Sequence, residues 1–349
     1  MIYSMTKSYG WTRYVFVQGF AMLLGIAAFV VFTVIDPDLI ADKWVYLTIF
    51  NVLFIVGLIF FGKGDEVGSR AWYRFAGIGV QPSEIVKVIF IVLLAKQVSN
   101  YKEQRTLNKF PSIIKLGLHW LLYFALIAVI PNDLGSALIF LAIFVIMLIC
   151  AGIAWYWMAA AAAAVAAMVP LFWNFLLKDY QKKRILAPYI PDVVDPTGQG
   201  ITWQTNHCKD ALASGRWTGV GFGEGSFAQS SYNARHTDCI FASIGEELGM
   251  IACIAIIVLL SIIIIRCCII GLRSGSPFGM LICFGVAAAL AFQTFVNIGM
   301  CIGITPVVGI TLPFFSYGGS SIVAMYAAVG LVSGVKYRPK PRQNFLQYQ

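Results

Sequence analysis

Long apolar stretches recur through most of this sequence, and each is close in length to a membrane-crossing helix. The 349 residues are 59% hydrophobic and only 12% charged, with a mean hydropathy of +0.80. Soluble domains carry about 25% charged residues, whereas about 20 apolar residues in a helix cross the hydrocarbon of a bilayer. The short alternating segments of a transmembrane β-barrel do not occur. We therefore expect an all-α, polytopic membrane helix bundle.

Nine apolar spans are expected, with one long hydrophilic segment among them. The spans lie near residues 14–35, 44–61, 83–99, 113–130, 134–151, 154–177, 239–265, 277–302 and 320–336. We treat residues 1–349 as a single integral membrane domain and 178–238 as its large extracellular loop. The orientation follows from Lys and Arg in segments 100–112 and 266–276 and in the C-terminal tail, because cytoplasmic loops are enriched in these residues.

The net charge of +9 fits basic loops that face anionic lipid, so a nucleic-acid partner is not expected. The loop 178–238 is also basic. Either it is a solvated loop of mixed charge, or it meets an anionic headgroup such as a pyrophosphate.

All eight cysteines except Cys208 lie in or beside apolar runs, which is typical of small core residues. Neither a disulfide framework nor a zinc site is expected.

The residues His236, Thr237 and Asp238 stand directly before the apolar run that begins at Cys239. A carboxylate at the mouth of a membrane helix is costly to desolvate, so its position calls for a physical reason. Either Asp238 caps the helix that follows, or it is a general base that accepts a proton from a sugar hydroxyl. Helical spacing places Glu247, further along, close to the same helix face.

Other polar residues lie at the ends of expected spans. Glu84 and Lys87 are three residues apart, so they either pair with each other or bind a substrate. Asp133 either caps the helix after it or belongs to the site.

The glycines of segment 219–225 predict a tight turn, because a nucleotide-binding loop requires a preceding strand and a following helix. The Pro- and Gly-rich segment 305–321 breaks the helical pattern. We expect a partly re-entrant loop there, beside an outer cavity.

Taken in order, these motifs resemble the SEDS family, which is named for shape, elongation, division and sporulation. The resemblance covers nearly the whole chain and rests on segments 68–84, 132–135, 184–186, 195–196, 219–221, 236–238, 245–249, 297–299 and 312–320. It implies a peptidoglycan glycosyltransferase that polymerises lipid II at the outer face of the bacterial cytoplasmic membrane, for elongation, division or sporulation. The alternatives are a lipid II flippase and a scaffold that only recruits partners.

The resemblance also implies roles for individual residues. Asp238 would deprotonate the 4-hydroxyl of the acceptor GlcNAc for attack on C1 of the donor MurNAc. The substrate-binding candidates are Arg70, Trp72, Lys87, Asp133, Arg235, His236, Glu247, Ser316, Gly318 and Gly319. The cationic ones would hold the leaving pyrophosphate, which a divalent cation such as Mg²⁺ or Mn²⁺ would help to neutralise, although no metal ligands can be assigned. The implied partners are a class B penicillin-binding protein, divisome or elongasome proteins, and membrane lipid.

Three features depart from the family pattern. The chain has Tyr232-Asn233-Ala234-Arg235 where the family usually has a Pro-Glu pair, and Ala71 where an Arg commonly precedes Trp72. In addition, the family has ten helices, and the first span here resembles the second of that set. We therefore expect the native start to lie upstream of Met1.

Overall fold

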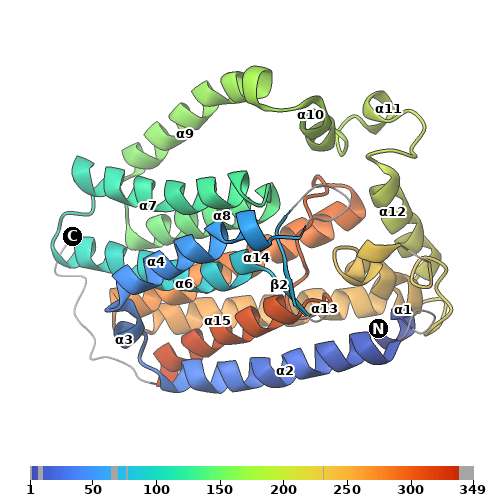
Figure 1. Ribbon diagram of the computed structural model, residues 1–349, viewed down its shortest axis with the longest axis horizontal. Helices are drawn as coiled ribbons and strands as arrows, with labels where there is room; N and C mark the ends of the chain where they lie inside the picture. The colour runs from blue at the N-terminus through green and yellow to red at the C-terminus, as the bar shows by residue number, and fades with distance from the viewer. Residues whose placement is uncertain (1, 7–10, 64–69, 76–77, 231, 338–349) are drawn as a thin grey trace. The chain divides into compact units, whose positions relative to one another are not determined.

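The computed structural model describes residues 2–6, 11–63, 70–75, 78–230 and 232–337 (Figure 1). These residues form helices and one small hairpin. The chain divides into two compact units. The first comprises residues 1–11, 153–258 and 294–316, and the second comprises residues 12–152, 259–293 and 317–349.

Among the described residues, eight helical segments are long and apolar enough to cross a membrane. They are α2 (Trp11–Val34), α4 with α5 (Trp44–Val56 and Leu58–Phe61), α7 (Phe110–Val129), α8 (Leu134–Ala151), α9 with a π-helical turn (Trp155–Leu171 and Phe172–Leu176), α13 (Ile240–Leu272), α14 (Pro277–Ile302) and α15 (Gly319–Tyr337). The expected all-α polytopic bundle is therefore confirmed. The remaining expected span coincides with α6 (Pro82–Glu103), which carries five charged residues and so falls outside the apolar set.

Helix α6 is the central helix of the second unit. It contacts α3 (Pro37–Ala41), α4, α7, α8 and α15 (Figure 1). Because neighbours surround it, residues on most of its faces are buried, which is why its sequence shows no single apolar stripe. Helices α2 and α15 approach closely at glycines, with Gly25 against the Tyr326 ring and Gly330 against the Phe29 backbone. Small residues allow such close packing in membranes.

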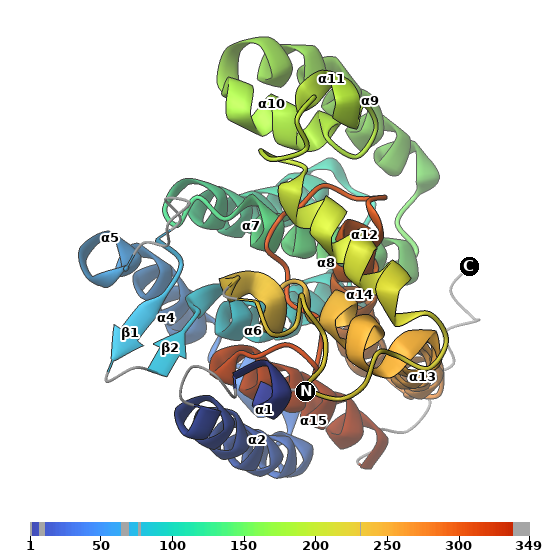
Figure 2. The ribbon, with the colours of Figure 1, turned by 90° about the vertical axis from the view of Figure 1, so that its right-hand side faces the viewer.

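A two-stranded antiparallel hairpin lies beside α4 and α5 in the same unit (Figure 2). Its strands are β1 (Tyr73–Phe75) and β2 (Ile78–Val80). The Tyr73 hydroxyl donates to the Phe54 carbonyl at 2.8 Å and so joins the hairpin to α4. The hairpin leads directly into α6, which places Gln81 at the N-terminal end of the central helix.

The first unit contains the segment 178–238, which includes several short helices. It holds α10 (Asp179–Leu186), α11 (Pro191–Val194), α12 (Trp203–Gly215) and a 3-10 turn, η3 (Asn233–His236), while α1 (Ile2–Thr6) contacts η3. The Asp195 carboxylate accepts hydrogen bonds from the Gly200 and Thr202 amides at 2.8 and 3.1 Å. These bonds fold the turn that starts α12.

Helix α13 is broken at Gly249, where φ is 80° and ψ is 180°. The backbone of residues 216–221 fills this break. Four hydrogen bonds of 2.8–3.3 Å join the segments, from the Val220 and Gly221 amides to the Glu246 and Glu247 carbonyls and from the Met250 and Ile251 amides to the Arg216 and Trp217 carbonyls. Gly219, with a φ of 82°, lies so close to Glu247 that no side chain fits. The tight turn expected from the glycines is therefore present, and it completes the hydrogen bonding of α13.

Candidate functional site

Asp238 lies between η3 and α13, and its backbone is fixed by a side chain from α14. The Asn297 amide nitrogen donates to the Asp238 carbonyl at 2.8 Å and to the Ile310 carbonyl at 2.7 Å. Asn297 is fully buried, whereas Asp238 is only half-buried. One buried side chain thus ties the backbone of Asp238 to the segment after α14.

The segment that follows α14 also contacts the residue before Asp238. The Ser316 hydroxyl donates to the Thr237 carbonyl at 2.6 Å and accepts from the Leu312 amide at 2.8 Å. A Cβ at Gly309, where φ is 70°, would lie 3.6 Å from the Asp238 Oδ2 atom. The segment expected to be re-entrant therefore lies beside the carboxylate. Protein groups satisfy part of its backbone, as a re-entrant segment would require.

Arg235 and His236 shape the turn that leads into Asp238. The Arg235 guanidinium donates to the carbonyls of Tyr232 and Met5 at 2.7 and 2.9 Å, and the Ser243 hydroxyl donates to the Arg235 carbonyl at 3.0 Å. Both side chains are buried. Burial, followed by the charge of Arg235, lowers the pKa of His236 to about 4, so this imidazole is neutral at pH 7.

An aromatic group lies next to this turn and was not predicted from the sequence. The Trp203 ring lies 4.0 Å from His207 and 4.8 Å from Tyr232, measured between ring centroids. Burial raises the pKa of the Tyr232 hydroxyl, and Cys239 and Asp238 raise it further. Tyr232 is therefore within electrostatic reach of Asp238. The four-residue spacing of Trp203 and His207, which brings their rings together on one helix face, was the available signal.

The two glutamates of α13 are buried and hold one loop in place. Glu246 accepts from the Ser226 hydroxyl and from the Phe227 and Ala228 amides, all at 2.8–3.0 Å. Glu247 accepts from the Ser4 hydroxyl at 2.6 Å and from the Gln229 amide nitrogen at 3.2 Å. The placement of Glu247 in a cavity with Asp238 stays a prediction, because these described partners belong to other segments.

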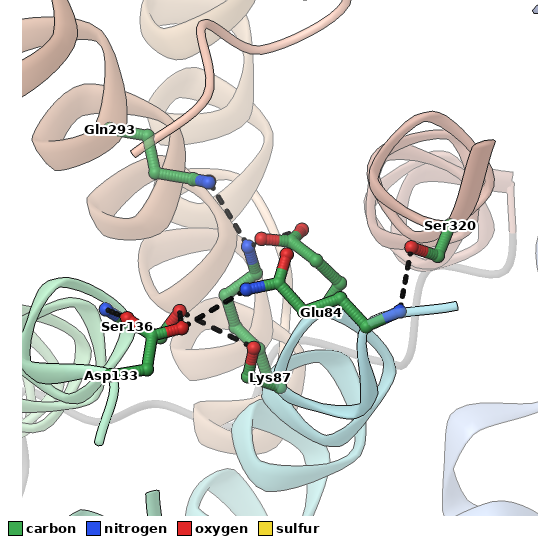
Figure 3. A network of polar contacts seen from close by, with 8 residues as sticks. Glu84, Lys87, Asp133, Ser136, Gln293 and Ser320 are labelled. Atoms are coloured by element: carbon green, nitrogen blue, oxygen red, sulfur yellow. Dashed lines mark hydrogen bonds and ion pairs between the residues drawn. The ribbon is translucent and has the colours of Figure 1, made fainter. Parts of the chain in front are cut away.

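A second polar network occupies the N-terminal half of α6 in the other unit (Figure 3). The Lys87 ammonium lies 2.9 Å from the Glu84 carboxylate and donates to the Gln293 side-chain oxygen at 3.1 Å. All three residues are at least 96% buried. The pairing alternative for Glu84 and Lys87 is therefore present, and a contact of Lys87 with substrate stays a prediction.

Asp133 belongs to the same network and caps α8. Its carboxylate accepts from the Ser136 amide at 2.8 Å, the Ser136 hydroxyl at 2.7 Å and the Gln81 side-chain nitrogen at 3.0 Å (Figure 3). The Gln81 amide in turn donates to the Ser320 hydroxyl at 3.1 Å. Burial raises the pKa of Asp133 despite these bonds. The capping alternative is confirmed, and a site role for Asp133 stays a prediction.

The other sequence candidates also fall in the second unit. Arg70 is exposed, and Trp72 pairs with Lys63 in a β-bridge. The Gly318 amide donates to Gln18 at 3.3 Å, and Gly319 is the first residue of α15. The structure therefore groups Asp238, Arg235, His236, Glu247 and Ser316 in one unit and the remaining candidates in the other.

Within the described part of the chain, no three His, Cys, Asp or Glu side chains are arranged to hold a metal ion. The divalent cation expected from the resemblance thus finds no protein ligand set among these residues.

Comparison with known proteins gives a consistent result. Residues 1–340 match the FtsW, RodA and SpoVE family, described as cell cycle proteins. The chain is 32% identical to the peptidoglycan glycosyltransferase MrdB of Escherichia coli K12, over 89% of this chain and 82% of MrdB. It is also 32% identical to the probable peptidoglycan glycosyltransferase FtsW of Geobacter metallireducens, over 93% of this chain and 84% of that protein.

Solved structures show the same fold. One is a chain from a peptidoglycan synthase complex that coordinates polymerization and crosslinking, with 26% identity, a TM-score of 0.78, and coverage of 94% of this chain and 90% of that chain. Another is the rod shape determining protein RodA of Thermus thermophilus, with 22% identity, a TM-score of 0.70, and coverage of 97% and 92%. The chain therefore belongs to the FtsW, RodA and SpoVE family of cell cycle proteins.

Proposed function

We propose that this protein polymerises lipid II into glycan strands at the outer face of the cytoplasmic membrane, with Asp238 as the general base. Peptidoglycan glycosyl transfer is the activity that the names of its curated relatives carry. The observation that carries the proposal is the way Asp238 is held. Buried Asn297 and Ser316 fix the backbone of Asp238 and Thr237, while the side chain of Asp238 stays half-buried beside Gly309.

Such an arrangement suits general-base catalysis. The base has to lie within about 2.6–3.2 Å of the proton that it accepts, and a fixed backbone limits where a short Asp side chain can reach. Asp238 would take the proton of the acceptor 4-hydroxyl while that oxygen attacks C1 of the donor MurNAc. The C1–oxygen bond to undecaprenyl pyrophosphate breaks as the new glycosidic bond forms. A positioned base contributes about 10²–10⁴-fold to such a step.

Among the cationic candidates for the leaving pyrophosphate, Arg70 is favoured by its exposure. The charged ends of Lys87 and Arg235 are buried and bonded to other protein groups. Trp72, Gly318 and Gly319 remain proposed substrate contacts on the basis of the family motifs. The proposed partner is a class B penicillin-binding protein, supported by the similarity to a chain from a peptidoglycan synthase complex.

The test is polymerisation of labelled lipid II by the purified protein with its class B partner, comparing wild type with Asp238→Asn. Asn caps a helix about as well as Asp, so this substitution keeps any capping role and removes the base. We expect glycan strands from wild type and a loss of at least about 10²-fold in the variant, with an unchanged melting temperature.

The matched control is Asp210→Asn, which removes an exposed carboxylate on α12 of the same unit and should leave polymerisation unchanged. Equal polymerisation by Asp238→Asn and wild type would rule out Asp238 as the base. Inactivity of every protein, with transfer of lipid II across vesicle membranes, would instead favour the flippase alternative.

A further inference from the structure

Helix α9 and its π-helical turn carry the chain to the edge of the membrane. Residues 155–175 form a candidate membrane span of 21 residues, and the most apolar part of this span has no buried residue. At about 1.5 Å per residue, its length matches the hydrocarbon thickness of about 30 Å. Trp155 begins the span and Trp173 lies near its end, as aromatic residues do at the two membrane–water boundaries. The chain beyond Leu176 therefore starts at such a boundary.

Helices α10 and α11 follow directly from this boundary (Figure 1). Helix α10 begins at Asp179, three residues after Leu176, where the π-helical turn ends. Neither α10 nor α11 contains a buried residue. Large apolar side chains nevertheless occur here, with residues 39–77% exposed at Tyr180, Ile185, Tyr189, Ile190 and Val193. Exposed apolar residues gathered in this way indicate a contact surface, because packing inside the protein does not explain them.

The same segment is rich in positive charge. Within residues 178–184, the cations are Lys178, Lys182, Lys183 and Arg184, against the single carboxylate of Asp179. Lys182 Nζ lies 3.8 Å from that carboxylate, whose side chain is 94% exposed, so this ion pair is weak. A solvated charged face would account for the lysines but not for the apolar residues beside them. Basic residues next to aromatic and aliphatic ones are typical of segments that lie in the headgroup region of a membrane.

We propose that residues 178–194 form an interfacial anchor, which binds anionic phospholipids of the outer leaflet. The ammonium groups of Lys178, Lys182 and Lys183 pair with lipid phosphates. The side chains of Tyr189 and Val193 insert where the headgroups meet the acyl chains. A lipid surface fits because the segment starts three residues beyond a membrane span and its charge is complementary to that of the lipid. The inference goes beyond glycan polymerisation, since this binding requires no glycosyl transfer.

The anchor is joined to the rest of the loop at one carboxylate. Asp195, the residue after α11, accepts hydrogen bonds from the Gly200 amide at 2.8 Å and from the Thr202 amide and hydroxyl at 3.1 and 2.8 Å. The next residue, Trp203, begins α12, and its ring centroid lies 4.8 Å from that of Tyr232. Binding of the anchor to lipid therefore limits the movement of α12 relative to the bilayer.

The test measures how deep Val193 lies in the full-length protein in lipid nanodiscs. A nitroxide label is attached at Val193→Cys, after Cys150→Ala and Cys268→Ala have removed the two half-buried native thiols. The same protein without Val193→Cys gives the background signal. Collisions of the label with oxygen, which concentrates in hydrocarbon, are compared with its collisions with a water-soluble nickel chelate.

The lipid is varied first. In nanodiscs of phosphatidylglycerol and phosphatidylethanolamine, we expect the label to meet oxygen more often than the nickel chelate. In nanodiscs of phosphatidylcholine alone, which carries no net charge, we expect the balance to shift toward the nickel chelate. The lysines are unchanged in this comparison, so it does not depend on the folding of a charge variant. A label that favours the nickel chelate in both lipids overturns the proposal, and shielding of that label by the class B partner would assign the surface to protein instead.

The lysines are then tested in the anionic nanodiscs with the labelled variant Lys178→Gln/Lys182→Gln/Lys183→Gln. We expect the label to shift toward the nickel chelate, as it does in phosphatidylcholine. A label that stays at the depth found with the native lysines overturns their assignment to lipid phosphates.

The matched control is Lys43→Gln/Lys109→Gln/Lys115→Gln, which removes three exposed lysines outside the loop. We expect this change to leave the depth of the label unaltered. An equal shift in the control would trace the effect to net charge and overturn the anchor. None of these readouts requires glycan synthesis, so they decide the anchor even if the proposed function fails.

Discussion

The two polar regions of this protein differ in how their central charged residues, Lys87 and Asp238, are held. Around α6, charged side chains bond to one another and to neighbouring side chains, as Lys87 does with Glu84 and Gln293. Around Asp238, side chains from other segments bond to the backbone, as Asn297 and Ser316 do. A charge held by protein partners stabilises a fold, whereas a held backbone presents its side chain in a fixed place. We therefore expect an architectural role for the first region and a chemical role for the second.

The largest effect is a loss of stability, expected when the buried ion pair of α6 is broken. Lys87→Met leaves the buried Glu84 carboxylate without its cation, which costs about 3–5 kcal/mol of stability. Thermal unfolding in detergent measures the loss. The double variant Lys87→Met/Glu84→Gln removes both charges and should recover most of the stability. A Lys87→Met protein that melts like wild type but makes no glycan would contradict the architectural role of this region. It would place Lys87 in the substrate site instead.

A pH titration of stability tests the turn before Asp238. The pKa of His236 is about 4 in the folded protein and about 6.5 in an unfolded chain, so the unfolded state binds the extra proton. His236 therefore lowers stability as the pH falls from about 6.5 to 4, by at most about 3 kcal/mol. Melting temperatures between pH 7.5 and pH 4 measure this, with His236→Gln as the control. An equally steep acid loss in His236→Gln would assign the effect to other groups.

Substitution of Asn297 tests whether the held backbone around Asp238 matters for polymerisation. Asn297→Ala deletes the donors to the Asp238 and Ile310 carbonyls, so we expect polymerisation to fall by about 10²-fold. The comparison variant is Gln293→Ala on the same helix, whose bond goes to the Lys87 side chain. Melting curves for both variants separate positioning from folding. If Asn297→Ala and Gln293→Ala lose polymerisation equally at equal stability, the two regions do not differ in function.

The smallest effect is expected at Asp133. Asp133→Asn keeps a side-chain oxygen for the Ser136 amide and should change stability by only a few tenths of a kcal/mol, whereas Asp133→Ala should lose about 1 kcal/mol. Melting curves and lipid II polymerisation are both measured. If Asp133→Asn melts normally but polymerises poorly, the carboxylate charge acts in the site rather than only at the helix end.

The membrane helices could be predicted because length and hydropathy are local properties of the sequence. The break in α13 could not, because the apolar run 239–265 looks continuous and the groups that fill the break come from residues 216–221. Helix α12 could not be predicted from hydropathy, since its 13 residues are largely polar.

The candidate site, too, could be predicted only where the signal is local in the sequence. Asp238 could be identified from its position before an apolar run. The role of Asn297 was missed because its partner lies 59 residues away and one Asn in an apolar helix does not reveal what it binds.

The break at Gly249 also bears on how the protein is made. Residues 216–221 leave the ribosome before α13, yet they supply four backbone hydrogen bonds that α13 lacks around Gly249. An unsatisfied backbone group in hydrocarbon costs several kcal/mol. We therefore expect the part of α13 before Gly249 to stay at the lipid–water boundary until the earlier segment docks onto it. Membrane insertion of α13 and closure of the loop over it would then be one coupled step of biogenesis.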